Sequence, residues 1–187
     1  DIREINLNSL RKNIGLIQQD IFLFATTIRE NIAYGKENAT IEEVINAAKT
    51  AQIHNYIETL DKGYDTIIGE RGTDLSGGQK QRIGIARAVI LNPSILIMDD
   101  TTSSVDTETE SLINDSLKTI MENRTTLIIS NRISTVQKAN KIFVIEKGEI
   151  IEEGRHQELL EKNGKYKNIY NLQLKPTENK ATTTINK

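Results

Sequence analysis

The chain has no cysteine and no tryptophan, and it contains only two prolines and two histidines in 187 residues. The absence of cysteine excludes a disulfide scaffold and any thiolate metal site, and two histidines leave little for a zinc site. No hydrophobic run approaches the roughly 18 consecutive apolar residues that a transmembrane helix requires. With neither disulfides nor metal to stabilise it, the chain is predicted to be a globular domain that is stabilised by its hydrophobic core.

Neither sign of charge dominates, because 24 Lys and Arg oppose 26 Asp and Glu and give a formal net charge of −2. The sequence lacks the basic excess expected of a protein that binds nucleic acid, so we predict no nucleic-acid partner. An apolar share of 37% at this length supports one packed domain and excludes wholesale disorder. The chain begins at Asp1 in what reads as the interior of a domain, so we expect a segment to precede it.

Short apolar segments bounded by turn residues predict five strands. Two of these strands contain continuous apolar runs, Ile95–Met98 and Leu127–Ile129. Such runs are typical of strands covered on both faces in an α/β sheet. Lys147 and Gly148 predict a hairpin turn between the last two strands. In chain order the predicted strands are Ile14–Ile17, Ile95–Met98, Thr125–Ile129, Ile142–Ile145 and Glu149–Ile151.

Helical periodicity and capping residues account for the intervals between the strands. Helices predicted between about residues 26 and 91 interrupt the strand–helix alternation, which indicates a helical subdomain inserted in an α/β core. Residues 175–187 read as a disordered polar tail. The predicted helices begin at the capping box of Thr40 and Glu43, span Ile53–Leu60, run from Ser76 to the stop at Asn92–Pro93, span Glu108–Met121, and occur twice after Gly154.

The segment Ser76-Gly77-Gly78-Gln79 lies directly before a predicted helix. Two glycines let a ligand approach the backbone closely, and the serine hydroxyl lies at the helix start. The unpaired N–H groups and the positive end of the helix dipole make such a terminus well suited to a phosphate. Taken alone, the segment fits an ordinary glycine-rich loop with a serine cap even better.

Two acidic residues, Asp99 and Asp100, follow a predicted strand. Ligands of open α/β sheets bind at the carboxyl ends of strands, where one carboxylate can hold Mg²⁺ through water and its neighbour can orient a nucleophilic water. A turn that begins at Asp100 is an equally good interpretation. Gln19 follows the first strand and can ligate Mg²⁺ or order a water, although an exposed glutamine is more often plain surface.

Taken together, these features resemble the nucleotide-binding domain of ABC (ATP-binding cassette) exporters over about residues 1–174. Leu75–Arg82 is similar to the signature motif, which is the most specific feature of that family. The other matching segments are Gln19–Ile32 (the Q-loop and the segment after it), Thr66–Gly72 (the X-loop), Ile95–Asp99 (Walker B), Ser103–Asp106 (the D-loop), Ile128–Thr135 (the switch loop) and the closing hairpin Lys147–Gly154.

The resemblance implies an α/β fold with a P-loop NTPase-like ABC ATPase core, in which helices flank a parallel sheet and a helical subdomain is inserted. It also implies that two such domains form a head-to-tail dimer around two ATP molecules. Each ATP would lie between the phosphate loop of one domain and the signature motif of the other. Ser76, Gly77, Gly78 and Gln79 would therefore contact a nucleotide that is bound mainly by the partner.

The resemblance further assigns roles to single residues, with ATP and Mg²⁺ as the cofactors. Gln19 would couple the γ-phosphate and Mg²⁺ to the membrane domain, and Asp99 would hold the metal through water. Glu70 would face the intracellular helices of the transporter. Asp106 is the acidic residue of the D-loop.

The sequence departs from the family pattern in three places. It contains no Gly-x-x-x-x-Gly-Lys-Ser/Thr, because the family places that loop and the first core strands before the position at which this chain begins. Asp100 stands where the family has a catalytic glutamate, and its side chain is one methylene short of the reach that a water-orienting base needs. Asn131 stands where the family has histidine and has no titratable ring.

We therefore predict the ATP-binding, energy-coupling domain of an ABC exporter at the cytoplasmic face of the cell membrane. With Gln19 and Asp99 retained but Asp100 and Asn131 altered, its own site is expected to hold ATP and hydrolyse it slowly. The expected partners are a second nucleotide-binding domain, most simply in a heterodimer, and a transmembrane domain N-terminal in the same chain. The alternatives are a hydrolytically competent homodimeric exporter and, less favoured by the X-loop, a soluble ABC ATPase.

Overall fold

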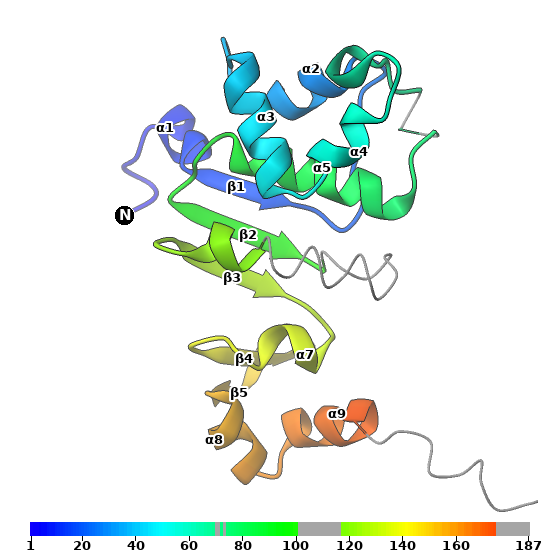
Figure 1. The fold of residues 1–187 in the computed structure, drawn as a ribbon. Coiled ribbons are helices and arrows are strands. Elements are labelled where there is room, and N and C mark those ends of the chain that lie inside the picture. The colour runs from blue at the N-terminus through cyan, green and yellow to red at the C-terminus, as the bar shows by residue number, and fades with distance from the viewer. Residues whose placement is uncertain (70–71, 73, 101–116, 175–187) are drawn as a thin grey trace, which may run out of the picture. The chain divides into compact units, whose positions relative to one another are not determined.

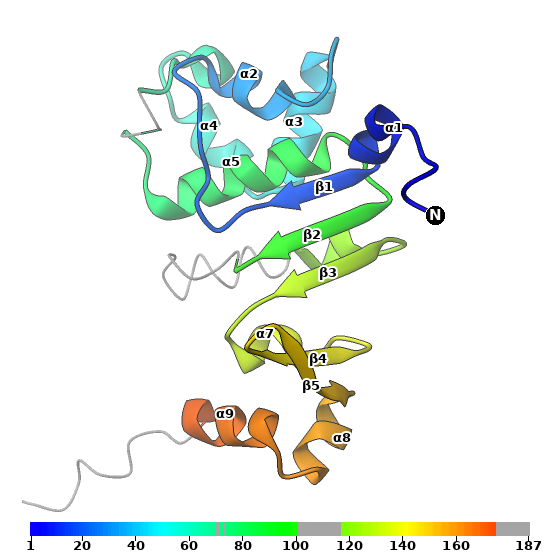
Figure 2. The same cartoon turned by 180° about the vertical axis from the view of Figure 1, so that it is seen from behind.

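The computed structural model describes residues 1–69, 72, 74–100 and 117–174. The chain divides into two compact units, the first from Asp1 to Ile129 and the second from Ser130 onward. Figures 1 and 2 show the ribbon from opposite sides, and each unit is described below by itself. None of the helices in these ranges is long and apolar enough to span a membrane.

The first unit contains a parallel sheet, which confirms the predicted α/β class. In the sheet β2 lies between β1 and β3, and both pairings are parallel. Because the strands are parallel, their carboxyl ends leave the sheet at one edge, which Figure 1 shows as three arrowheads pointing the same way. The strands are β1 (Ile14–Ile17), β2 (Ile95–Asp99) and β3 (Thr125–Ile129).

Only one face of this sheet is well covered within the described residues, so the prediction of two covered faces is wrong for β3. Ile17, Leu96 and Met98 are at most 2% exposed and belong to the main hydrophobic core. Residues on the opposite face remain open, with Leu127 54% and Ile129 56% exposed. The physical reason is that the described helices whose residues share the main core with Leu96 and Met98 cover the first face. A continuous apolar run in the sequence does not show that both faces are buried.

Helices separate β1 from β2 in the sequence, as predicted for an inserted helical segment, and they supply much of the same core. Thr27 and Thr40 each begin a helix with a complete capping box. The helix predicted over Ile53–Leu60 is shorter in the structure. The elements are α2 (Ile28–Ala33), α3 (Ile41–Thr50), α4 (His54–Glu58), the 3₁₀ turn η1 (Gly63–Asp65) and α5 (Gly77–Val89).

Two helices of the first unit were not predicted, namely α2 and, before β1 in the sequence, α1 (Leu7–Lys12). None of the residues of α1 is buried, so no apolar periodicity marks it in the sequence. The usable signal was Asn6, whose side chain accepts hydrogen bonds from the N–H groups of Asn8 and Ser9. The helix predicted over Glu108–Met121 lies mostly outside the described residues, although residues 117–121 are helical.

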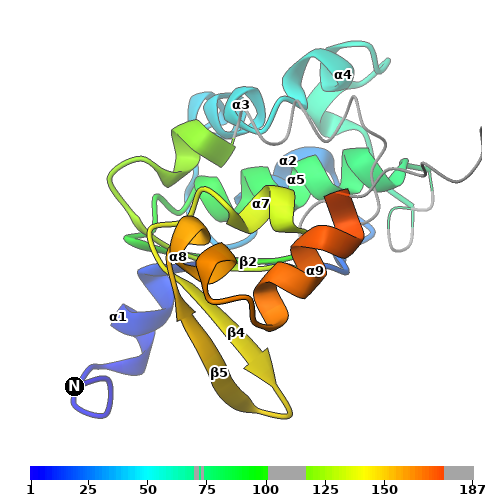
Figure 3. The same ribbon diagram turned by 90° about the horizontal axis from the view of Figure 1, so that it is seen from below.

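Over residues 130–174 the second unit is a β-hairpin with three short helices, which Figure 3 shows from below. Lys147 and Gly148 form the predicted turn, both with positive φ (53° and 85°). Its small core contains Ile133, Ile142, Leu159 and Tyr166. The elements are α7 (Ile133–Val136), β4 (Ile142–Glu146), β5 (Glu149–Gly154), α8 (His156–Glu161) and α9 (Lys165–Leu174).

The close packing of Ile21 on α5 gives a stability prediction, because a Cβ at Gly84 would clash with the Cδ1 of Ile21. Gly84→Ala is therefore expected to lower the free energy of unfolding by about 1–2 kcal/mol, despite alanine's better helix propensity. In the background of Ile21→Val, which removes the clashing methyl group, the same change should become stabilising by up to about 1 kcal/mol. Chemical denaturation of the four variants measures the effect, and a destabilisation equal in both backgrounds would contradict it.

Candidate functional site

The carboxyl edge of the parallel sheet brings together three of the residues predicted from the sequence. Asp99 is the last residue of β2 and lies opposite Ile129 of β3. Asp100 follows it, and both aspartates are partly exposed. Gln19 lies two residues beyond the end of β1, on an exposed loop. Because β1 pairs in parallel with β2, an amide side chain and two carboxylates leave the sheet at the same edge.

Asp100 adopts a backbone conformation that is uncommon for a residue with a side chain, with φ at 39°. Its N–H donates to the carbonyl oxygen of Ile129 over 2.8 Å, which ties the residue to the end of β3. The turn interpretation of Asp100 is therefore compatible with the structure. It does not compete with a functional role, since left-handed residues are enriched at active sites.

The predicted phosphate-type motif forms the N-terminus of α5. The Ser76 hydroxyl accepts from the N–H of Gln79 over 3.2 Å, and the Gln79 side-chain oxygen accepts from the N–H of Ser76 over 2.8 Å. This reciprocal capping box leaves the N–H groups of Gly77 and Gly78 in the first turn without partners inside the helix. Gly77 is exposed and has no side chain, so an anion can approach the backbone there.

The N-terminus of α5 and the carboxyl edge of the sheet lie on the same side of the first unit. Helix α5 runs antiparallel to β2, as Figures 1 and 2 both show. Ser76 and Asp99 nevertheless belong to different elements and offer different chemistry. The helix start presents N–H donors to an anion, whereas the sheet edge presents oxygen ligands that suit Mg²⁺.

Asn131 lies in the second unit, two residues beyond the end of β3. Its side chain is exposed. Its backbone carbonyl accepts a hydrogen bond from the Gln173 side chain over 2.6 Å. Two further predicted residues, Glu70 and Asp106, lie outside the described residues.

A buried hydrogen-bond hub fixes the loop that follows Gln19, and the sequence interpretation missed its members as functional residues. Asn31 is fully buried, and its amide oxygen accepts from the Phe24 N–H over 2.9 Å. Its amide nitrogen donates to the carbonyls of Phe24 and Thr27, each over 3.0 Å. A single side chain on α2 therefore holds the backbone of the loop in place.

Arg87 of α5 completes the hub from the other side. Its guanidinium donates to the Asn31 carbonyl over 2.8 Å, to the Asn31 amide oxygen over 2.9 Å and to the Phe22 carbonyl over 2.8 Å. It also lies over the stacked rings of Phe24 and Tyr34, whose centroids are 4.4 Å apart. Burial lowers the pKa of Arg87, which still stays protonated at neutral pH.

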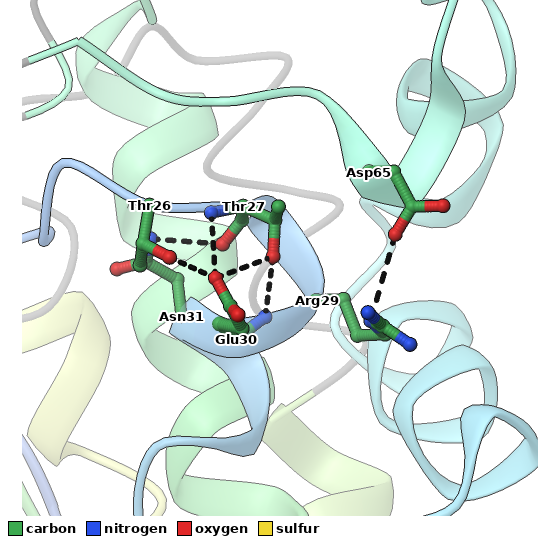
Figure 4. A network of polar contacts seen from close by, with 6 residues as sticks. All are labelled: Thr26, Thr27, Arg29, Glu30, Asn31 and Asp65. Atoms are coloured by element: carbon green, nitrogen blue, oxygen red, sulfur yellow. Dashed lines mark hydrogen bonds and ion pairs between the residues drawn. The ribbon is translucent and has the colours of Figure 1, made fainter.

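A short stretch of backbone pairing joins the start of α2 to the segment before the signature-like motif. The Ile28 N–H donates to the Thr66 carbonyl over 3.0 Å, and the Ile68 N–H donates to the Thr26 carbonyl over 2.9 Å. Beside this pairing, Arg29 and Asp65 form an ion pair of 3.5 Å (Figure 4). The loop after Gln19 and the X-loop-like segment are thus parts of one connected structure.

The carboxylate of Glu30 closes the capping box at the start of α2. It accepts hydrogen bonds from the Thr27 N–H over 3.1 Å, from the Thr27 hydroxyl over 3.0 Å and from the Thr26 hydroxyl (Figure 4). These bonds, first of all the one from the Thr27 backbone, lower the pKa of Glu30. The helix start therefore keeps its negative cap at neutral pH.

The chain is similar to known transport proteins. The family model described as ABC transporter matches residues 1–103. The chain is 58% identical over 92% of its length to an uncharacterized ABC transporter ATP-binding protein, YknU, of Bacillus subtilis, of which it covers 29%. It is 50% identical over 94% of its length to an ATP-dependent lipid A-core flippase of Syntrophus aciditrophicus, of which it also covers 29%.

Among solved structures, a bacterial Atm1-family ABC exporter with ATP bound matches with a TM-score of 0.88 and 42% sequence identity. That match covers 95% of this chain and 31% of the exporter chain. The chain thus spans under a third of the length of these relatives. The likeness holds over nearly all the described residues and includes both units.

From the hydrogen bonds of Arg87 we predict that its replacement by lysine lowers the free energy of unfolding more than the same replacement of Arg29. Arg87→Lys replaces a planar fork of three hydrogen bonds by a single ammonium and should lower the free energy of unfolding by about 2 kcal/mol. Arg29→Lys is the matched control, because Arg29 is exposed and keeps its ion pair as lysine, so its effect should stay within about 0.5 kcal/mol. Thermal and urea unfolding compare the two variants, and equal losses would show that the hub contributes no special stability.

Proposed function

The chain belongs to the ABC transporter family, and on that premise we propose that it is the ATP-binding, energy-coupling domain of an ABC exporter. It would power the translocation of a substrate across a membrane by ATP-driven dimerisation and hydrolysis. The observation that carries this proposal is the N-terminus of α5, where Ser76 and Gln79 cap each other and Gly77 leaves backbone N–H groups accessible. The flippase and the Atm1-family exporter reported above support export as the direction of transport.

The residues present fit the two groups that the family implies, ATP and Mg²⁺. Ser76, Gly77, Gly78 and Gln79 would contact the γ-phosphate of a nucleotide held by a second nucleotide-binding domain, so they act in trans. The Ser76 hydroxyl accepts one bond inside the capping box and keeps its own proton for donation. Donors fixed in this way need no reorganisation when the two domains close.

The sheet edge suits the metal. Asp99 would hold Mg²⁺ through a water molecule and Gln19 would reach it from the neighbouring strand, since this ion keeps several waters and takes few protein ligands. Bound Mg²⁺ would neutralise charge on the phosphates during phosphoryl transfer. The hydrogen bonds of Asn31 and Arg87 would support this role, because they fix the loop between Gln19 and α2 to the helices α2 and α5.

The catalytic competence of this site is proposed to be low. Asp100 would have to orient the attacking water with a side chain one methylene shorter than glutamate, and a base works only within about 2.6–3.2 Å of its target. Asn131 would offer a hydrogen bond to the γ-phosphate but no positive charge. Since Ser76–Gln79 is intact, this domain would complete its partner's site while hydrolysing ATP slowly at its own.

The proposed function also implies two partners and a location in the cell. The second nucleotide-binding domain would belong to a different subunit, with a homodimer as the alternative. The membrane domain would be N-terminal in the same protein, which places this domain at the cytoplasmic face of the cell membrane. Glu70 is proposed to face that membrane domain, and Asp106 to lie at the contact between the two nucleotide-binding domains.

Restoration of the family's residues tests the catalytic part of the proposal. In the complete protein assembled with its partner, Asp100→Glu combined with Asn131→His should raise Mg²⁺-dependent ATP turnover at this site by at least about tenfold, because alignment of the base contributes on the order of 10²–10⁴ in rate. Asp100→Asn combined with Asn131→His is the control and should show no gain. Unchanged turnover in the Asp100→Glu, Asn131→His protein would contradict an impaired site.

A charge at the start of α5 tests the role in trans. Gly77→Asp places a carboxylate where the phosphate is proposed to bind, and it should reduce turnover in the assembled dimer by about 10²-fold or more. The helix itself should not suffer, because acidic residues stabilise the first turn. Gly77→Ser adds a side chain without charge and should cost far less. ATP turnover and the melting temperature, measured together, separate the two effects.

A further inference from the structure

We propose that Gln173 of α9 is a positioning residue that holds the switch-loop backbone and thereby sets where the Asn131 side chain points. The Gln173 amide oxygen accepts from the Ile133 N–H over 2.9 Å. Its amide nitrogen donates to the Asn131 carbonyl over 2.6 Å. One side chain, 40 and 42 residues away in sequence, therefore holds both an acceptor and a donor of the segment between β3 and α7.

The switch-loop segment needs such an external partner. Helix α7 is only four residues long, and its N-cap residue Arg132 makes no side-chain capping bond. The Ile133 N–H would therefore remain one of the orphan donors at the helix start. Gln173 takes the place of the missing cap, and the Ser130 hydroxyl accepts from the Arg132 N–H over 3.1 Å. Backbone groups of Asn131, Arg132 and Ile133 are thus all fixed.

Helix α9, which carries Gln173, is held in place by packing and by hydrogen bonds. Helices α7 and α9 pack against each other, and Figure 3 shows them side by side. Tyr166 of α9 is 2% exposed in the small core of the second unit, and its hydroxyl lies 2.7 Å from the Nδ1 of His156. At the N-terminus of α9 the Glu152 carboxylate accepts from the N–H groups of Lys165 and Tyr166. The helix that carries Gln173 is therefore anchored at its start and along its buried side.

The functional consequence rests on the proposed function, in which Asn131 donates a hydrogen bond to the γ-phosphate. The Asn131 side chain is exposed, so the surrounding protein does not bury it in one rotamer. Its direction then depends on the backbone that carries it, and Gln173 holds that backbone at the carbonyl of the same residue. A γ-phosphate contact requires this alignment, whereas ADP has no γ-phosphate and does not.

Three variants of the complete protein in detergent, assembled with its partner, test the proposal. Gln173→Met removes both hydrogen bonds at similar volume, and Gln173→Glu keeps the acceptor for Ile133 while it removes the donor to Asn131. Asn168→Met is the matched control, since Asn168 lies exposed on the same helix. The probes are the dissociation constants of ATP and ADP, and hydrogen exchange of the peptide that covers residues 130–136.

We expect Gln173→Met to speed exchange in residues 130–136 by about tenfold, as the loss of a hydrogen bond implies, and to lower the preference for ATP over ADP by a similar factor. Gln173→Glu should lower the preference while the Ile133 amide keeps its protection, and Asn168→Met should change neither. In an Asn131→Ala background, Gln173→Met should cause no further loss of the ATP preference, which a merely structural role would not predict.

Two results would overturn the positioning role, namely an unchanged ATP preference in Gln173→Met or a loss that adds fully to that of Asn131→Ala. Failure of the proposed function gives a different pattern. A wild-type protein that binds no ATP would contradict the function, and it would overturn the role toward ATP with it. The exchange rates would still report whether Gln173 holds the loop.

Discussion

The direct parallel pairing of β1 with β2 is the constraint on which the rest of the site depends. More than 70 residues separate Ile17 from Ile95, yet the two strands are neighbours in register, and the helices between them must fold back over the sheet. Only this pairing brings Gln19 to the edge at which Asp99 and Asp100 emerge. The same fold-back orients α5 antiparallel to β2, so its positive N-terminal end lies on the side of the sheet that carries the carboxylates.

Hydrogen bonds to backbone, more than ion pairs, set the geometry of the loops that carry the candidate site residues. Asn31 and Arg87 hold the loop after Gln19 by its main-chain groups. Gln173 does the same for the switch loop. In each case a long polar side chain from a packed helix fixes a segment that has no regular structure of its own, which keeps the side chains of that segment available for a ligand.

All the strands and the longer helices could be predicted from sequence, whereas the short helices α1, α2 and α7 and the long-range contacts were not. The strand Ile14–Ile17 and the cap at Ser76 appear where apolar runs, glycines and capping residues indicate them. The Asn31–Arg87 bonds span 56 residues, and a single sequence carries no signal for such a pair. The openness of β3 at Leu127 was also unpredictable, because an apolar run reports hydrophobicity but not whether a neighbour covers it.

This domain is proposed to retain the parts that bind ATP and complete a partner's site, while Asp100 and Asn131 leave its own hydrolysis slow. The most direct test is Mg²⁺-dependent ATP turnover by the complete protein, purified alone in detergent, together with the amount of nucleotide bound. We predict bound ATP with turnover far below about 1 s⁻¹, the lower end of ordinary enzyme rates. Turnover at or above that rate by the protein alone would contradict the impaired site and favour a competent homodimer.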